Sequence, residues 1–239
     1  MNWRIITAIN ALIALSYVSA STVEEDGRIS IETTPPTRIT APGLTKLARG
    51  LLYVPTNYRP SQPVPLLVLL HKSGGDCSEW FRPDAKGPHG LYAARADAAH
   101  FAIFAAQAAG SSTWGSGGPK SFGHDDIAIR NALQTVFQHC AVDRHRLAIG
   151  GFSDGASYAL SLGLANADLF TDIIAFSPGY IVRSAGRGKP LIFIAHGGAD
   201  PVLPIARTSR TFVPALRKNG YSVEFRETGG GHGVAPATA

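Results

Sequence analysis

The sequence contains few charged residues and almost no cysteine or methionine. Of its 239 residues, 16% are charged, two are cysteine and one is methionine, whereas 45% are hydrophobic. This composition excludes an intrinsically disordered chain, and two cysteines are too few for a disulfide-rich scaffold. The length allows a sizeable core and fits one large α/β domain better than two small ones.

Motifs that would indicate a metal, nucleotide or nucleic-acid site are also missing. The sequence has no H-E-x-x-H, no paired-cysteine spacing and no G-x-x-x-x-G-K-[ST]. The net charge is +5, but the basic residues are scattered rather than clustered. We therefore expect no metal, no nucleotide and no nucleic-acid partner.

The N-terminus has the three-part pattern of an export signal. Arg4 precedes an apolar run over residues 5–18, and small residues at 18–20 offer a cleavage site. We predict that residues 1–20 are a signal peptide, which makes the protein secreted or periplasmic. No later apolar run reaches the roughly 20 residues of a bilayer span, so we expect no stable membrane insertion.

After the predicted signal, residues 21–43 read as an irregular lead-in because they are rich in proline and threonine. The domain proper is expected over residues 44–239. Cys77 and Cys140 could form one disulfide in an exported protein, or they could remain buried thiols. The sequence leaves both possibilities open.

Strand-like and helix-like segments alternate along the domain. Val64–Leu70 is a continuous apolar run, typical of a strand buried on both faces of a sheet. The pair Asp125 and Asp126 is expected to cap a helix that begins nearby. The alternation predicts a doubly wound, mostly parallel α/β sheet. Strands are expected at 44–54, 64–70, 101–107, 146–151, 172–176, 191–195 and 221–226, and helices at 90–100, 124–139, 155–165 and 205–219.

One strand-to-helix junction has the pattern of a nucleophile turn. Residues 151–155, Gly-Phe-Ser-Asp-Gly, match G-x-S-x-G between an apolar strand and a helix. Small residues beside Ser153 allow a tight turn that exposes its hydroxyl. The N-terminus of the following helix favours negative charge that develops during attack. Ser153 is therefore the candidate nucleophile.

A serine hydroxyl needs a base, and the base needs an orienting acid. His232 lies in a glycine-rich loop just beyond the last expected strand, and Asp200 follows the strand at 191–195. The chain order Ser153, Asp200, His232 is that of the α/β-hydrolases. We predict a catalytic triad of these three residues, with His196 in a structural role.

The tetrahedral oxyanion of such a reaction needs N–H donors. The backbone N–H of Asp154, directly after the nucleophile, is one candidate. The second is expected from the loop that follows the strand at 64–70, where we choose Ser73 and keep Lys72 as the alternative. Trp114 lies in a loop predicted above the strand ends, where its side chain could contact substrate, although a lone tryptophan is more often a packing residue.

These motifs together resemble those of the small, lidless esterases grouped as phospholipase/carboxylesterase and polyhydroxybutyrate-depolymerase-like hydrolases. The resemblance implies an α/β-hydrolase fold and cleavage of a small-molecule or polymeric carboxylic ester through an acyl-enzyme, with no cofactor. It assigns Ser153 as nucleophile, His232 as general base and then acid, and Asp200 as the group that holds the histidine tautomer. It spans residues 51–234 and rests on Leu69-Leu70-His71-x-x-Gly74-Gly75, Gly123-His124-Asp125-Asp126, Gly151-Phe152-Ser153-Asp154-Gly155, His196-Gly197-x-x-Asp200 and Gly231-His232.

The sequence departs from this family in two places. Lys72 stands where the family usually has glycine, and only residues 233–239 follow His232, without the pattern of a terminal helix. We therefore expect His232 to be held less firmly. A serine peptidase, an acyltransferase or a catalytically weak binding scaffold remain alternatives on the same fold. The natural ester, its acyl length and the oligomeric state stay open.

Overall fold

The computed structural model describes residues 27–32, 36–82, 91–110, 112–115, 118, 121–184 and 186–234. The predicted signal peptide lies outside these ranges and stays a prediction. Within them, no helix combines the length and the hydropathy that a bilayer crossing requires.

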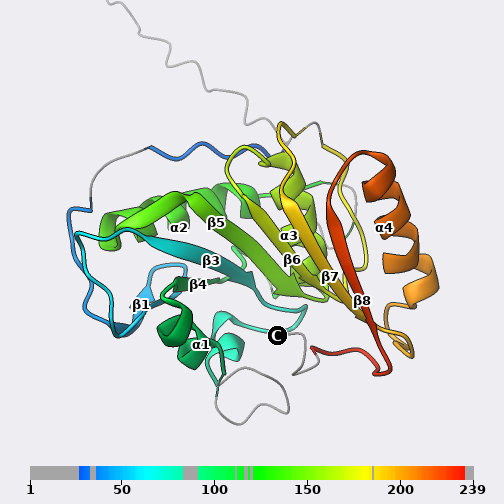
Figure 1. Cartoon of the computed structure of the whole chain (residues 1–239), viewed down its shortest axis with the longest axis horizontal. Helices are drawn as coiled ribbons and strands as arrows, with labels where there is room; N and C mark the ends of the chain where they lie inside the picture. The colour runs from blue at the N-terminus through cyan, green and yellow to red at the C-terminus, as the bar shows by residue number, and fades with distance from the viewer. Residues whose placement is uncertain are drawn as a thin grey trace, which may run out of the picture.

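An eight-stranded sheet runs through the described part of the chain, in the order β1-β2-β4-β3-β5-β6-β7-β8 (Figure 1). All strands from β4 to β8 across the sheet run parallel, and the hairpin β1–β2 adds an antiparallel edge. The prediction of a mostly parallel α/β sheet is confirmed. The strands are β1 (Gly43–Leu47), β2 (Gly50–Val54), β3 (Val64–Leu70), β4 (Ala102–Ala106), β5 (Val142–Phe152), β6 (Asp172–Phe176), β7 (Leu191–Gly197) and β8 (Val223–Thr228).

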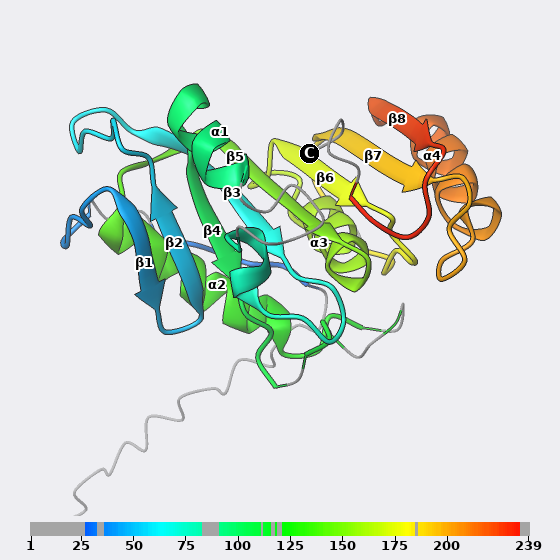
Figure 2. The same ribbon diagram turned by 90° about the horizontal axis from the view of Figure 1, so that it is seen from below.

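Helices cover the two faces of the sheet unequally (Figure 2). Alternate side chains of β3 point to opposite faces, so Leu66 and Val68 join a large core while Leu69 joins a smaller one. The large core lies beneath α2 (Asp125–His139), α3 (Asp154–Ala165) and α4 (Ser209–Lys218), and the smaller one beneath α1 (Leu91–Ala99) and a 3₁₀ turn at Cys77–Trp80.

Two expected elements are divided in the structure. The strand expected at 44–54 is a hairpin, because the chain reverses at Ala48–Arg49. Gly50 has φ +153°, and a Cβ there would lie 2.2 Å from the Ala105 carbonyl oxygen. The helix expected at 205–219 begins as a 3₁₀ turn, and regular helix starts only at Ser209.

The two cysteines are free thiols on opposite faces of the sheet. Cys140 belongs to the large core and Cys77 packs against the smaller one, so the sheet lies between them and no disulfide joins them. The described residues of the lead-in that precede Gly43, where β1 begins, form neither helix nor strand. They are nevertheless anchored: Arg28 pairs with Asp168 at 2.7 Å.

The carboxyl ends of β3, β5, β7 and β8 meet along one edge of the sheet. In open parallel sheets, this edge is where loops from different strands converge on a site. The loops after these four strands carry every residue that the sequence predicted for a triad and an oxyanion hole.

Candidate active site

Ser153 occupies a sharp turn between β5 and α3. Its backbone has φ +59° and ψ −116°, a strained conformation for a residue with a side chain. The flanking glycines make the turn possible. A Cβ on Gly151 would lie 2.6 Å from the backbone of Gly155, and one on Gly155 would lie 2.3 Å from the Leu70 carbonyl oxygen. Local packing therefore requires the two glycines of the G-x-S-x-G pattern.

His232 links Ser153 to Asp200. Its Nε2 lies 2.9 Å from the Ser153 hydroxyl oxygen, and its Nδ1 lies 2.7 Å from Oδ2 of Asp200. Because an ionised carboxylate only accepts hydrogen bonds, the proton is assigned to Nδ1, which leaves Nε2 to accept from the serine. The structure thus brings together the three residues predicted as a triad.

Asp200 is held from several directions. Its Oδ1 accepts the backbone N–H groups of Val202 and Leu203, both at 2.8 Å, and its side chain is fully buried. Burial alone would raise the pKa of this carboxyl group. The hydrogen bonds from Leu203, His232 and Val202 outweigh burial and hold the pKa of Asp200 below its ordinary value. The group therefore stays ionised.

The loops after β7 and β8 are joined by backbone contacts. Gly198 donates to the carbonyl of Thr228 at 2.7 Å, and Ala199 donates to that of Gly230 at 3.1 Å. The His232 ring also packs against Phe152, with centroids 4.9 Å apart. Only 16% of the His232 side chain is exposed. The expectation of a loosely held histidine is not met, because these contacts restrain its glycine-rich loop.

On the other side of Ser153, the buried ring of His71 holds the loop after β3. Its Nδ1 lies 2.8 Å from the Lys72 carbonyl oxygen, and its Nε2 faces the donors of Ala108 and Gln107, each at 3.3 Å. This pattern puts the proton on Nδ1. Because the peptide is planar and trans, the next N–H points away from the buried ring, and that N–H belongs to Ser73.

The two N–H groups predicted as oxyanion donors have no hydrogen-bond partner among the described residues. Neither Ser73 nor Asp154 donates its backbone N–H to any group in the described part of the chain. The Asp154 side chain is fixed by the N–H of Trp114 at 2.8 Å and the hydroxyl of Tyr180 at 3.0 Å. The oxyanion assignment remains a prediction that this geometry permits.

The assignment of Trp114 to a substrate site is corrected, because its side chain is buried in the core and a substrate could not reach it. Its side chain has 0% exposure, and its indole N–H donates to the His71 carbonyl at 2.7 Å. The ring packs between His71 and Tyr158, with centroids 4.8 and 5.7 Å away. Packing in the core was the commoner role for such a residue, and here it supports the loop that carries His71.

Asp125 also has a role other than the expected helix cap. The N-cap of α2 is His124, which makes no capping side-chain hydrogen bond. The Asp125 carboxylate instead accepts the N–H groups of Ala109 at 2.6 Å and Gly115 at 2.7 Å. It thereby fastens the glycine-rich loop behind the nucleophile turn.

Sequence reasoning missed the orienting role of His71. The signal was present, since a histidine directly after a strand as apolar as Val64–Leu70 is seldom a surface residue. Its two partners, Gln107 and Ala108, come from the end of β4. Only the strand order, with β4 beside β3, shows that they meet.

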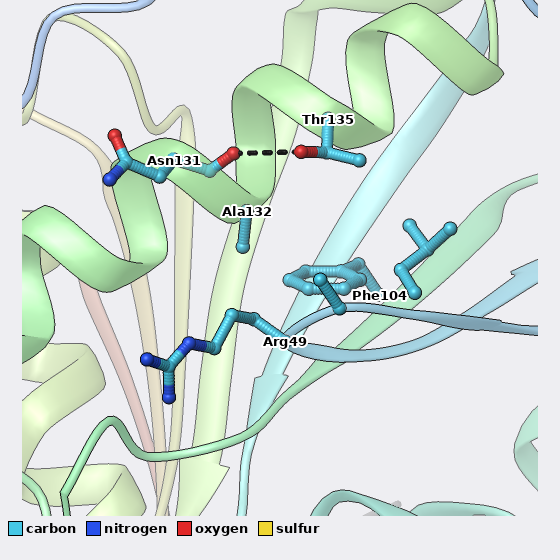
Figure 3. Close-up of a pocket in the computed structure, with 7 residues that line it drawn as sticks. Arg49, Phe104, Asn131, Ala132 and Thr135 are labelled. Carbon is cyan, nitrogen blue, oxygen red and sulfur yellow. Dashed lines mark hydrogen bonds between the residues drawn. The ribbon is translucent and has the colours of Figure 1, made fainter.

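Two described cavities lie away from Ser153. Figure 3 shows a cavity of about 120 Å³ between the β1–β2 hairpin and α2, where Arg49 and Phe104 lie opposite Thr135. A second, of about 610 Å³, lies on the face of the sheet that carries α1 and includes Phe176 and Phe193. No residue of the predicted triad lines either one.

No group of three or more His, Cys, Asp and Glu side chains in the described ranges could hold a metal ion. The expectation that the protein uses no cofactor stays a prediction.

Comparison with known proteins agrees with this geometry. Residues 120–237 match the family model for phospholipase/carboxylesterase. Feruloyl esterase C of Emericella nidulans is 30% identical over 156 residues, which is 65% of this chain and 56% of the relative. Feruloyl esterase D of Neurospora crassa is 26% identical over 180 residues, 73% of this chain and 61% of the relative. The chain thus spans less than two thirds of the length of these curated relatives.

Solved structures show the same fold at low sequence identity. A CE1 ferulic acid esterase from Anaeromyces mucronatus, in complex with ferulic acid, has a TM-score of 0.64 at 16% identity, covering 90% of this chain and 91% of that one. The S-formylglutathione hydrolase of Staphylococcus aureus has a TM-score of 0.60 at 14% identity, covering 77% and 85%. The sheet order and these solved structures lead to one conclusion: the chain has the α/β-hydrolase fold, and its sequence is similar to that of the phospholipase/carboxylesterase family.

Proposed function

We propose that this protein is a serine carboxylesterase that cleaves its substrate through an acyl-enzyme on Ser153. The observation that carries the proposal is the continuous chain of hydrogen bonds from Ser153 through His232 to Asp200, at 2.9 and 2.7 Å. A hydroxyl becomes an effective nucleophile when a neutral imidazole accepts its proton and an acid fixes that imidazole.

In the first half-reaction, the Ser153 oxygen attacks the ester carbonyl and Nε2 of His232 takes its proton. The resulting imidazolium is stabilised by the Asp200 carboxylate, which stays ionised. His232 then protonates the leaving alcohol. In the second half-reaction, His232 takes a proton from a water molecule that attacks the acyl carbon, and it returns this proton to the Ser153 oxygen as the acyl–oxygen bond breaks and the carboxylic acid leaves.

The oxyanion of each tetrahedral intermediate is assigned to the N–H groups of Asp154 and Ser73. Both are unused within the described chain, and the second is aimed by the contact between His71 and Lys72. Donors fixed in advance lower the barrier without reorganising during the reaction.

The Lys72 side chain does not weaken the case for catalysis. Its ammonium group pairs with Glu79 in the 3₁₀ turn at Cys77–Trp80. The lysine that stands in place of the family's glycine is therefore bound to a nearby carboxylate. The alternative of a weak binding scaffold was based on Lys72 in the oxyanion loop and on the short segment after His232. Against it, the Lys72 ammonium pairs with Glu79 and the His232 ring contacts Asp200 and Phe152.

The relatives suggest where to look for the substrate. Two relatives in sequence are named feruloyl esterases, and one of the similar solved structures is a ferulic acid esterase. We therefore include aromatic hydroxycinnamoyl esters beside simple acyl esters among the candidate substrates.

The test is ester hydrolysis by the purified protein. We would measure turnover of p-nitrophenyl esters of increasing acyl length and of methyl ferulate, with wild type and Ser153→Ala. Ser184→Ala is a matched control, because Ser184 is exposed and has no hydrogen bond in the described chain. The proposal expects turnover that Ser153→Ala abolishes and Ser184→Ala retains. Folded wild type that hydrolyses none of these esters would overturn it.

A further inference from the structure

A second buried histidine lies behind the predicted acid. His196, on β7, is completely buried and its Nε2 lies 3.2 Å from Oδ2 of Asp200. This is the same carboxylate oxygen that accepts Nδ1 of His232 at 2.7 Å. Asp200 is therefore flanked by two imidazoles, and only one of them reaches Ser153.

The surroundings of His196 determine where its proton lies. Nε2 also faces the Leu203 carbonyl oxygen at 2.9 Å, so both neighbours of this nitrogen are acceptors. Nδ1 lies 2.7 Å from the Ser209 hydroxyl, which can donate to it. Burial lowers the pKa of His196 below its ordinary value, although the carboxylate of Asp200 opposes this shift. His196 is therefore neutral, with its proton on Nε2, where the Leu203 carbonyl oxygen accepts it at 2.9 Å and Oδ2 of Asp200 lies 3.2 Å from the same nitrogen.

We propose that His196 is a positioning residue that, as a neutral donor to Oδ2, holds the Asp200 carboxylate in the orientation that receives His232. The proposal rests on the triad function proposed above and adds a residue to it. The backbone donors of Val202 and Leu203 fix Oδ1, and His196 does the same for Oδ2, so the carboxylate cannot rotate away from His232.

The other charged groups around His196 are few. Glu227 on β8 lies beside it in register, and this carboxylate pairs with Arg210 of α4, with Nε and Oε2 3.2 Å apart. Both side chains of this pair are exposed. Asp200 and His232 are the remaining titratable neighbours, and Asp200 is the one that contacts the His196 ring directly.

This arrangement has a consequence for His232. Oδ2 divides its acceptor capacity between two N–H donors. When the His196 donor is removed, the oxygen becomes a stronger acceptor for His232 and stabilises its imidazolium. Without that donor, the titration of His232 should therefore move to higher pH, by about half a unit to one unit for the loss of one such hydrogen bond.

The experiment follows the His232 ring by NMR in protein labelled with ¹³C at histidine Cε1, alongside the pH profile of kcat/KM. We expect His196→Leu to raise the His232 midpoint and to move the acid limb of kcat/KM upward equally. His196→Gln retains a donor near Nε2 and should restore both values to those of wild type. Ser209→Ala is the matched control, since it removes the partner of Nδ1 and leaves the donor to Asp200 in place.

The ring titration can be read without turnover, which separates this proposal from the proposed esterase activity. If wild type shows no ester turnover while His196→Leu still shifts the His232 titration, the esterase activity is overturned and the positioning role of His196 is retained. The positioning role is overturned if His196→Leu and His196→Gln titrate like wild type, or if Ser209→Ala shifts His232 as far as His196→Leu does. Should His196→Leu fail to fold, His196→Gln against Ser209→Ala gives the same decision.

Discussion

Ser153 has a buried histidine on each side, and the two do different work. On the β3 side, His71 carries its proton on Nδ1 and holds the Lys72 carbonyl, which turns the N–H of Ser73 outward. On the β7 side, His196 carries its proton on Nε2 and contacts the Asp200 carboxylate. One ring orients a peptide and the other a carboxylate. The difference teaches that a buried imidazole can fix either half of a hydrolase site, according to which nitrogen keeps the proton.

The largest effect is expected on the β7 side, where the acid acts on the base. Asp200→Asn removes the acceptor for Nδ1 of His232 and allows the wrong tautomer. We expect kcat/KM for a p-nitrophenyl ester to fall by a factor on the order of 10⁴. Circular dichroism of the variant should match wild type. A loss of less than tenfold would mean that Asp200 does not orient the base.

The β3 side should respond less strongly. His71→Leu removes the donor to the Lys72 carbonyl, so the peptide that bears the Ser73 N–H is free to turn. Losing one oxyanion donor costs a factor of about 10² to 10³ in kcat, with KM little changed because the donor acts on the transition state. His71→Asn can still donate from a nitrogen near Nδ1 and should recover most of the activity. Equal losses in both variants would contradict an orienting role.

The positions of Ser153, Asp200 and His232 could be predicted from the sequence, whereas the contacts of the two buried histidines could not. The apolar run Val64–Leu70 and the G-x-S-x-G turn each reflect local chemistry, so the strand and the sharp turn at Ser153 could be predicted directly. Asp200 and His232 followed from their places after consecutive strands. The partners of His71 and His196 depend on contacts across the sheet, and a single sequence does not specify those contacts.

The errors have the same physical origin. Trp114 was assigned to a substrate site because its loop was expected above the strand ends. Its indole instead finds a buried carbonyl on the neighbouring loop. The Asp125 carboxylate reaches backbone N–H groups ten or more residues away, where a local cap was expected. In both cases a tertiary hydrogen bond determines where the side chain lies.

The pH dependence of stability gives a separate test of the burial of His196. The pKa of His196 is lower in the folded protein than in the unfolded chain, so the unfolded chain takes up a proton at a higher pH. Its contribution to stability is full above about pH 6.5 and declines as pH falls towards the folded pKa, by about 1.4 kcal/mol per unit across that window.

Urea unfolding at pH 7.5 and pH 5.5 measures this decline. We expect wild type to lose stability between the two pH values and His196→Gln to lose less of it, because glutamine does not titrate. The same dependence on pH in both proteins would show that His196 is not the group responsible.

The smallest effect is expected at Lys72. Its pair with Glu79 involves an ammonium whose side chain is 44% exposed, and pairs of this kind contribute at most about 1 kcal/mol to the free energy of unfolding. Lys72→Ala should stay within about threefold of wild-type kcat/KM. A loss as large as that of His71→Leu would mean that the ammonium takes part in the reaction.

The central claim is that Ser153 is a nucleophile activated by His232, and covalent labelling tests it most directly. A fluorophosphonate should add one phosphonyl group to the peptide that contains Ser153, with fluoride as the leaving group, and intact-mass and peptide mass spectrometry would locate it. We predict stoichiometric labelling of wild type, none of Ser153→Ala, and labelling slowed at least a hundredfold in His232→Ala. Wild type that stays unlabelled, or a label on another residue that survives Ser153→Ala, would contradict the account.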